Sequence, residues 1–228
     1  MVDTQDVDFD AIYRGDDPRF GLSTRAVWSI GVPQPEIARL IDQGKIHGDV
    51  LDAGCGEAAL SLTLAALGHN VVGVDISSAA IDLARSEAAR RHLANATFEV
   101  ADITSFSGYN GRFNTIIDCT LFNALPVDLR DAYQQSIVRA AAPASSYVIL
   151  VLDKAAFANA RDNPAASVTE DELRDAVSKY WVIDDIRPAR IYCNAPKEGT
   201  PVFAGVAFRD EPNGRTSIGG WLLSAHLS

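Results

Sequence analysis

Residues 49–75 read DVLDAGCGEAALSLTLAALGHNVVGVD, and this stretch decides the fold of the chain. The apolar pair at 50–51 is the end of a buried strand, and a glycine-rich turn follows it directly. The apolar, helix-favouring run at 58–67 ends at a glycine, which is a common helix-terminating residue. A second strand at 70–74 ends at Asp75. This order of strand, turn, helix and strand predicts a βαβ unit with two parallel strands.

The carboxyl end of such a unit is a place for a ligand, because open parallel sheets bind ligands outside the carboxyl ends of their strands. Gly54 and Gly56 have no Cβ, so a ligand can lie against the backbone of the turn. Asp75 stands at the tip of the second strand, where its carboxylate can accept hydrogen bonds from both hydroxyls of a ribose. The unit therefore predicts a site for a nucleoside cofactor.

Two nucleoside cofactors fit this plan, and the turn distinguishes between them. From Gly54 the sequence is GCGEAA, and the dinucleotide fingerprint G-x-G-x-x-G also accepts the Ala59 at its third position, so spacing alone leaves NAD open. Asp52 puts a negative charge beside the place of a pyrophosphate, which is unfavourable for an anion. The same charge suits a cationic ligand with an ammonium and a sulfonium. Cys55, inside the turn, is expected at the cofactor site as a small packing residue.

The pattern D-x-G-x-G followed by a strand that ends in Asp resembles the class I S-adenosylmethionine-dependent methyltransferases, and VLDAGCG with GVD is a specific form of it. The resemblance implies a Rossmann-like α/β fold, with a seven-stranded, mostly parallel sheet, helices on both faces and a reversed last hairpin. It also implies S-adenosylmethionine as the cofactor and S-adenosylhomocysteine as its product. A glycine turn that binds no ligand is the plain structural alternative.

Composition limits the other possibilities. The chain has 228 residues, 47% of them hydrophobic, which suits one α/β domain over 1–228. We expect an N-terminal arm or lid (1–35), a cofactor-binding core (36–194) and an insert with the closing strand (195–228). The formal net charge of −10, without a block of basic residues, argues against a nucleic-acid partner. Three widely spaced cysteines give neither a disulfide framework nor a metal site.

The first residues, MVDTQDVDFDAIYRGDD, are acidic and lack the apolar stretch of a signal peptide. No run of about 18 apolar residues occurs, so the sequence predicts neither a membrane-spanning helix nor a membrane partner. We expect a cytoplasmic protein that is a monomer or a homodimer.

The N-terminal arm has a helical segment in which Phe9, Ile12 and Tyr13 share one face, and a proline-rich segment that precedes an amphipathic helix at 36–43. Such an arm can fold over the mouth of the cofactor site as a lid. Trp28 is then expected near the cofactor or substrate, and core packing is its alternative role.

The stretch W-x-x-G-x-P-Q-P at 28–35 carries a second resemblance. It is similar to a branch of small-molecule methyltransferases that contains thiopurine and thiol methyltransferase-like enzymes and heterocyclic toxin methyltransferases. The resemblance covers essentially the whole chain and implies that this segment covers the methionine end of the cofactor. It implies an acceptor that is a small aromatic or heteroaromatic molecule.

Further strands are expected at 96–101 and 113–120. The family resemblance implies that Asp102 binds the adenine amino group, that Ile103 lies beside it, and that Ile76 packs against the adenine face. The alternative for Asp102 is a structural role in a turn or as a helix cap. Ser77 is expected to cap the helix that begins at 78.

Asp118 and Cys119 fall at the end of the fourth strand, so we expect both to face the transferable methyl group and to bind cofactor. The resemblance places a His at the position of Asn123, and Asn cannot act as a base. Either no protein base is needed, or the acceptor differs, or the base lies elsewhere. Positioning roles are therefore expected for Asp118, Cys119 and Asn123, while the four histidines are expected to be structural or at the surface.

The remaining chain predicts helices at 129–142 and 168–179, the latter with a capping box of Thr169 and Glu172. Strands are expected at 146–152, 180–193, 199–208 and 220–227, with the insert at 195–219 over the substrate side. Seven aromatic residues are available for an apolar acceptor pocket, although most should be core: Phe9, Tyr13, Phe20, Phe122, Phe157, Phe203 and Trp221. We select Tyr13, Phe20, Phe122 and Trp221.

The function that fits best is O-methylation of a small hydroxylated aromatic or heteroaromatic molecule, similar to a quinolone or an N-hydroxy heterocycle, with a detoxifying role. An acidic acceptor of this kind already exists partly as its anion and needs a mild base or none. The alternatives are S-methylation of small thiols or thiopurines, a non-catalytic S-adenosylmethionine-binding sensor or partner, and an NAD(P) oxidoreductase.

Overall fold

The computed structural model describes residues 7–17, 26–159, 167–194 and 204–228. Phe20 and Phe203, two of the aromatic candidates for the acceptor pocket, lie outside the described residues, as does the first part of the expected insert. None of the helices in the described ranges has the length and apolar character needed to span a bilayer.

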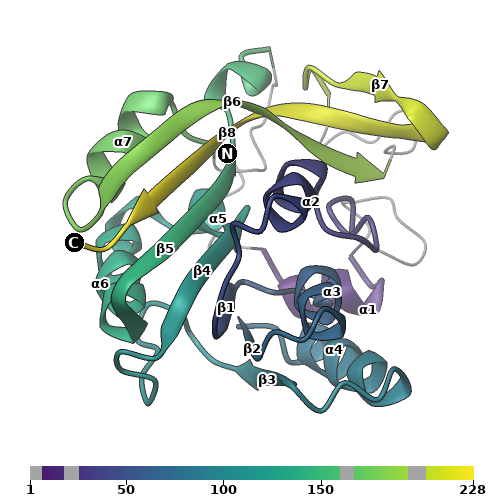
Figure 1. Ribbon diagram of the computed structural model, residues 1–228. Helices are drawn as coiled ribbons and strands as arrows, with labels where there is room; N and C mark the ends of the chain where they lie inside the picture. Colours follow the sequence, from purple (N-terminus) through teal and green to yellow (C-terminus); the bar gives the residue numbers. More distant parts are fainter. Residues whose placement is uncertain (1–6, 18–25, 160–166, 195–203) are drawn as a thin grey trace.

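One twisted sheet organises the chain (Figure 1), and its strands follow the order β3-β2-β1-β4-β5-β8-β6. The first five of these run parallel, whereas β8 pairs antiparallel with both β5 and β6. This topology confirms the Rossmann-like sheet with a reversed last hairpin, and the short β7 adds one further strand beside β8. The strands are β1 Val50–Ala53, β2 Val71–Asp75, β3 Ala96–Val100, β4 Phe113–Cys119, β5 Ala141–Leu152, β6 Val182–Asn194, β7 Arg209–Glu211 and β8 Arg215–His226.

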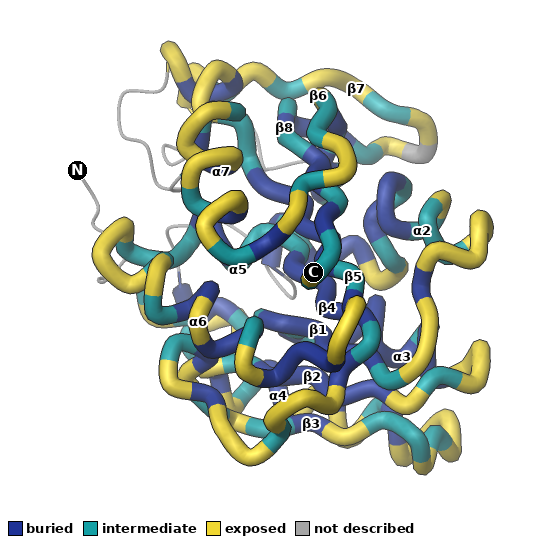
Figure 2. The backbone as a smooth tube through the Cα atoms, turned by 60° about the vertical axis from the view of Figure 1, so that its left-hand side comes forward, coloured by how far each residue is buried: buried dark blue, intermediate teal, exposed yellow. Residues whose placement is uncertain are grey.

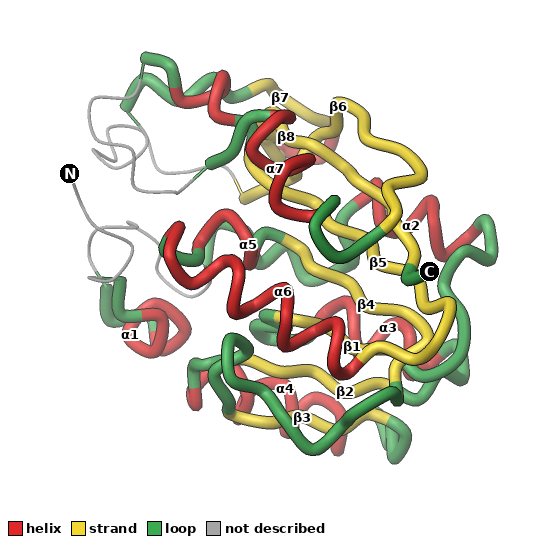
Figure 3. Tube along the Cα trace, turned by 90° about the vertical axis from the view of Figure 1, so that its left-hand side faces the viewer, coloured by secondary structure: helices red, strands yellow, loops and turns green. Residues whose placement is uncertain are grey.

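Helices cover both faces of the sheet. In Figure 3, α6 and α7 lie on one face, while α2, α3 and α4 lie behind the other. The α-helices are α1 Phe9–Arg14, α2 Pro35–Asp42, α3 Ala59–Ala66, α4 Ser78–Arg90, α5 Leu121–Ala124, α6 Arg130–Ala140 and α7 Glu170–Val177, and the 3-10 turns are η3 Val127–Leu129, η4 Lys154–Phe157 and η6 Pro212–Gly214. The expected caps are confirmed: Ser77 accepts from the Ala80 N–H, and Thr169 and Glu172 form a capping box.

The core is double-sided because the central strands are buried on both faces (Figure 2). On one face Ile137 of α6 and Leu173 of α7 pack against the sheet. On the other face Ile37 of α2 and Leu64 of α3 do the same. Such near-continuous burial explains why β1 and β2 read as plain apolar runs in the sequence.

The expected end of the chain needs correction. The described part of the strand predicted at 199–208 has no strand, and β7 begins only at Arg209. The closing strand β8 is longer than predicted and runs through Gly219 and Gly220. A Cβ on Gly220 would lie 2.5 Å from the Val151 carbonyl oxygen, so glycine in mid-strand here allows close backbone approach and does not break the strand.

The expectation that Asp118 faces the cofactor is wrong. Side chains alternate along a strand, and β4 turns Cys119 toward the cavity and Asp118 into the opposite core. The Asp118 carboxylate accepts from the Leu121 and Phe122 N–H groups at 2.9 and 3.1 Å, and from the Tyr133 hydroxyl at 2.8 Å. It therefore fixes the first turn of α5 to β4 and α6.

Two of the selected aromatic residues also belong to the core. Phe122 is fully buried, with the Arg130 guanidinium 4.9 Å from the centre of its ring. Trp221 packs against the core on the α6 and α7 side, since it points to the opposite face of β8 from Ile218. Both were selected because they are aromatic, and residue type alone does not show toward which side of the sheet a side chain points.

Burial raises the pKa of Asp118 to about 7, against the lowering effect of its Tyr133 and backbone hydrogen bonds. A carboxyl whose pKa is higher in the folded state favours folding below about pH 4, and this contribution is lost as the pH rises through about 7. We expect Asp118→Asn to remove this dependence. Between pH 4 and pH 8 the wild type should lose roughly 3–4 kcal/mol of unfolding free energy relative to the variant, measured by urea unfolding.

The matched control is Asp82→Asn on α4, because the Asp82 side chain is 78% exposed. This variant should follow the wild type at every pH. A wild type and an Asp118→Asn protein with parallel pH profiles would show that Asp118 ionises normally in the folded chain.

Candidate functional site

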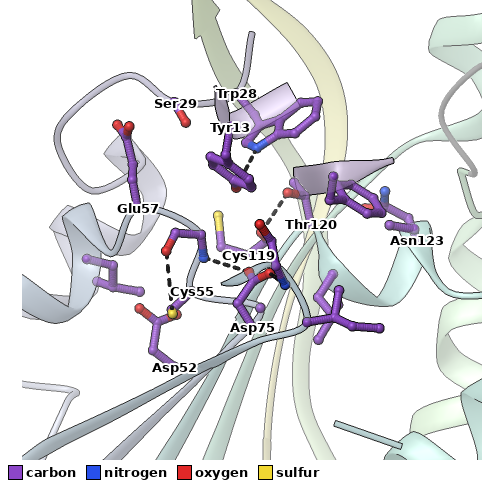
Figure 4. A pocket seen from close by; sticks show the side chains of 18 of the residues that line it. Tyr13, Trp28, Ser29, Asp52, Cys55, Glu57, Asp75, Cys119, Thr120 and Asn123 are labelled. Carbon is purple, nitrogen blue, oxygen red and sulfur yellow. Dashed lines mark hydrogen bonds between the residues drawn. The ribbon is translucent and has the colours of Figure 1, made fainter. Parts of the chain in front are cut away.

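A cavity of about 650 Å³ opens at the carboxyl ends of β1, β2, β4 and β5 (Figure 4). The arm closes over it with α1 and the segment 26–34. The glycine turn after β1 forms its floor. The site therefore lies where a parallel sheet places its ligands.

The backbone of the glycine turn permits only glycine at two positions. Gly54 and Gly56 have φ values of 71° and 54°, in the left-handed region. A Cβ on Gly56 would lie 2.4 Å from the Tyr13 hydroxyl oxygen, and one on Gly54 would lie 2.8 Å from Cβ of Leu121. Cys55 contacts the next strand, where a Cβ on Gly73 would lie 2.9 Å from its sulfur.

Asp75 joins the two turns at the tips of β1 and β2. Its Oδ2 accepts from the Gly56 N–H at 2.8 Å, and its Oδ1 accepts from the Ser77 N–H at 2.9 Å. A carboxylate has about four acceptor positions, and with the additional backbone hydrogen bond from Ile76 three of them are used within the protein. Burial raises the pKa of Asp75, and these hydrogen bonds oppose the rise.

Asp52 lies beneath the same turn. It is 2% exposed and accepts from the Ser61 hydroxyl at 2.5 Å, which holds its carboxylate against the start of α3. Burial raises its pKa to about 6. The carboxylate still borders the cavity, so its negative charge acts at the turn.

Two of the contacts that hold the arm to the rest of the protein involve Asp10 and Gln34. Asp10 accepts from the Ser77 hydroxyl at 2.5 Å and from the Ala79 N–H at 3.0 Å, which fixes α1 to the start of α4. Gln34 exchanges two hydrogen bonds with the backbone of Tyr192 on β6. These anchors place the arm across the mouth of the cavity.

Trp28 and Tyr13 form the underside of the arm. The Trp28 Nε1–H donates to the Tyr13 hydroxyl at 3.1 Å, and the Phe9 ring meets Trp28 edge-on at 6.3 Å between ring centres. Figure 4 shows both labelled side chains above the turn. Because the Tyr13 oxygen accepts from Trp28, its own proton is directed elsewhere.

The adenine-side candidates also meet at this cavity. Asp102, Ile103 and Ile76 all line it, with Ile76 65% exposed and Ile103 buried. Asp102 accepts from the N–H and hydroxyl of Thr104 at 2.9 and 2.7 Å. The turn role that was the alternative for Asp102 is present, and the residue borders the cavity as well.

The lining divides into two halves of different chemistry. An acidic half consists of residues of the arm and of the β1 to β3 turns: Asp8, Asp10, Asp52, Glu57, Asp75 and Asp102. An apolar chamber lies toward β5, β6 and β8 and consists of Val27, Leu152, Phe157, Ile191, Cys193 and Ile218. Among the described residues that line the cavity there is no Lys, Arg or His. The described residues also contain no metal-binding cluster of His, Cys, Asp and Glu.

Asn123, Thr120 and Cys119 lie at the boundary between the two halves (Figure 4). Asn123 is 3% exposed, and its Oδ1 accepts from the Leu152 N–H at 3.2 Å. This bond uses the amide oxygen, so Nδ2 is the atom through which Asn123, as a lining residue, could donate to a ligand. Burial raises the pKa of Cys119, whose thiol therefore stays neutral.

The structure thus brings most of the sequence-selected residues into one site. Around the cavity lie Tyr13, Trp28, Asp52, Gly54, Cys55, Gly56, Asp75, Ile76, Asp102, Ile103, Cys119 and Asn123, whereas Asp118, Phe122 and Trp221 do not line it. Sequence reasoning missed Ser29, Glu57 and most of the apolar chamber. No local signal identifies the chamber residues, because they come from strands far apart in the sequence.

Comparison with known proteins identifies the family. Residues 45–185 match the family model described as a methyltransferase domain. The 2-heptyl-1-hydroxyquinolin-4(1H)-one methyltransferase of Mycobacteroides abscessus is 58% identical over 221 residues, which cover 96% of each chain. The chain belongs to the class I S-adenosylmethionine-dependent methyltransferases.

Solved structures agree with this assignment. A structure described as "Conversion of a Disulfide Bond into a Thioacetal Group during Echinomycin Biosynthesis" is 33% identical, with a TM-score of 0.81 over 96% of this chain and 92% of that chain. The magnesium protoporphyrin IX methyltransferase of Synechocystis PCC 6803 with bound S-adenosylmethionine is 20% identical, with a TM-score of 0.57 over 85% and 76% of the chains. The latter likeness shows the fold.

The site fits S-adenosylmethionine on its own geometry. The glycine turn lines the cavity and lets Tyr13 and Leu121 pack directly on its backbone, and the acidic half favours a ligand with an ammonium and a sulfonium. NAD, whose pyrophosphate is anionic, would meet these carboxylates without a lining cation among the described residues. The cofactor is S-adenosylmethionine.

We expect Asp75→Ala to weaken the binding of S-adenosylhomocysteine at least 100-fold, because Asp75 holds the turns after β1 and β2 together and is our expected acceptor for two ribose hydroxyls. Hydrogen bonds to a charged group contribute about 1.5–3 kcal/mol each. Isothermal calorimetry measures the change, and Asp82→Ala on α4 is the matched control. Unchanged affinity in a folded Asp75→Ala protein would contradict the placement of the ribose.

Proposed function

We propose that this methyltransferase transfers a methyl group to the oxygen of a small hydroxylated heteroaromatic molecule, of the N-hydroxyquinolone type. The observation that carries the proposal is the chemistry of the cavity, where the described lining has an apolar half and neither a histidine nor a lysine to act as a base. The name of the 58% identical relative, a 2-heptyl-1-hydroxyquinolin-4(1H)-one methyltransferase, supports it.

On the cofactor side, each carboxylate has a proposed role. Asp75 accepts from the ribose hydroxyls, and Asp102 accepts from the adenine amino group beside Ile103 and Ile76. Asp52 supplies negative charge beneath the turn. Trp28 covers the methionine end, held there by Tyr13. When bound, the cofactor supplies an electrophilic methyl group on a sulfonium.

On the acceptor side, the protein orients the reacting oxygen of the acceptor, and the hydroxyl group loses its proton to water and not to a protein base. An N-hydroxy heterocycle is acidic enough to exist largely as an oxyanion near neutral pH. The Asn123 Nδ2–H donor, fixed by the Leu152 N–H, stabilises this oxyanion and orients it at the boundary of the two halves. Orientation of this kind can supply several kcal/mol toward the barrier, so no base is required.

Methylation at sulfur is the second candidate. It is favoured by the 33% identical structure, whose description names the conversion of a disulfide bond into a thioacetal group. A thiol is also acidic enough to react as its anion without a base in the protein.

The acceptor class can be tested by turnover. With S-adenosylmethionine and a panel of 1-hydroxyquinolin-4-ones, phenols and aromatic thiols, we expect methyl transfer to the N-hydroxyquinolones at the highest kcat/KM, detected as the O-methyl product by mass spectrometry. Higher kcat/KM for the thiols would favour the second candidate.

The pH dependence of kcat/KM gives a separate prediction. If the acceptor loses its proton to water, kcat/KM should rise with pH through the acceptor's own pKa and then level off. Two acceptors of different acidity should therefore show inflections separated by the difference of their pKa values. An inflection at one pH for both acceptors would instead reveal a protein group, for which Asp52, with a pKa of about 6, is the candidate in the cavity.

A further inference from the structure

The apolar chamber is a built part of the cavity. Val27, Phe157, Ile191, Cys193 and Ile218 are all under 8% exposed, and they come from four segments. Val27 belongs to the arm, Phe157 ends η4, and the others lie on β6 and β8, which run side by side in Figure 1. Four of them form one packed cluster of buried side chains.

The backbone around the chamber is held in place by hydrogen bonds. The Asn194 N–H donates to the Val27 carbonyl at 2.9 Å, and the Asn194 Nδ2–H donates to the Ser29 carbonyl at 2.9 Å. Arg215 donates to the Ile30 carbonyl at 3.0 Å. These bonds fix the arm to β6 and β8, so the chamber wall is preformed.

Among the described residues of the chamber wall, Cys193 is the only one with a hydrogen-bonding side chain. Its thiol already donates to the Thr216 carbonyl and contacts the Thr216 hydroxyl at 3.3 Å. Burial raises the pKa of this thiol, which is neutral. A polar or charged substituent would lose its hydration here without compensation, whereas an apolar one gains by leaving water.

The position of the chamber relates it to the reacting oxygen. Leu152 is a chamber residue, and its N–H is the group that fixes Asn123 at the boundary. An acceptor whose oxygen lies at Asn123 therefore has the acidic half on one side and the chamber on the other. A substituent next to that oxygen has buried apolar surroundings toward the chamber, while the apolar residues of α5 and η3 on its other side include the partly exposed Leu129.

We propose that the apolar chamber binds a linear alkyl substituent of the acceptor, and that Ile218 and Phe157 set the chain length that is accepted. The inference rests on the proposed function, which it extends from the head group of the acceptor to its tail. The name of the 58% identical relative includes a heptyl substituent, which is a linear alkyl chain of the kind that such a subsite would bind.

A different course for the tail is the apolar lip of the cavity at η3, which consists of Leu129, a lining residue that is 38% exposed, and Val127, which is 77% exposed and does not line the cavity. A chain on this lip would lie beside exposed side chains, whereas five of the chamber side chains are under 8% exposed, so the chamber removes more of the chain's surface from water. The chamber is therefore the more favourable of the two places.

The test uses 1-hydroxyquinolin-4-ones that carry hydrogen, methyl, propyl, pentyl, heptyl or nonyl at position 2. In the wild type kcat/KM should rise with chain length by up to about fourfold per buried methylene, until the chamber is full. Ile218→Phe should lower the ratio of kcat/KM for the heptyl and the unsubstituted acceptor at least 30-fold. Phe157→Ala should shift the optimum to a longer chain, and calorimetry with S-adenosylhomocysteine verifies that each variant is folded.

The matched control is Val127→Phe on the lip, the same kind of enlargement outside the cavity, which should leave the ratio unchanged. Two results overturn the inference while the proposed function stands: the unsubstituted acceptor is methylated but chain length has no effect, or Val127→Phe changes the ratio and Ile218→Phe does not. Failure of the wild type to methylate any member of the series overturns the proposed function and this inference together.

Discussion

The carboxylate of Asp75 is the constraint on which the site depends. It accepts from the Gly56 N–H in the turn after β1 and from the Ser77 N–H at the start of α4, so one side chain fixes both turns of the βαβ unit. Ser77 in turn donates to Asp10, which brings the arm over the cavity. The floor and the cover of the site are thus joined by one chain of hydrogen bonds. Because every member of this chain is close to the cavity, ordering of the turns and ordering of the arm are coupled.

The parts of this arrangement that are local in sequence could be predicted from the sequence. The glycine turn needs a left-handed backbone conformation, which only a few residue types adopt readily. The turn can therefore be recognised from its sequence pattern. Ser77 and the Thr169 and Glu172 pair satisfy N–H groups within one helical turn, and both caps were predicted correctly. The βαβ unit predicted parallel strands, and the resemblance carried by the D-x-G-x-G turn implied the Rossmann-like sheet that the structure has.

What failed depends on which way a side chain points and on contacts between distant segments. Asp118 and Cys119 are neighbours at the tip of β4, but a strand turns successive side chains to opposite faces, and only a three-dimensional register decides which faces the ligand. Trp221 lies on the wrong face of β8 for the same reason. The length of β8 was underestimated because residues 215–219 were assigned to the insert, whereas in the structure they form the first part of the strand; Gly220 allows the close approach of the Val151 carbonyl. The strands that form the chamber meet only in the folded sheet.

The division of the cavity follows from the topology and explains how one fold can keep its cofactor while changing its acceptor. The parallel strands β1 to β3 end in turns that present carboxylates and backbone N–H groups, and these suit a charged, hydroxylated nucleoside. The antiparallel pair β6 and β8 borders the cavity as long strands, so it offers a wall of alternating side chains instead of strand-end turns. Chamber side chains can change in size without disturbing the turns that hold the cofactor. Because the described lining has neither a histidine nor a lysine, we infer that selectivity rests on the acidity of the acceptor and on the shape of this wall.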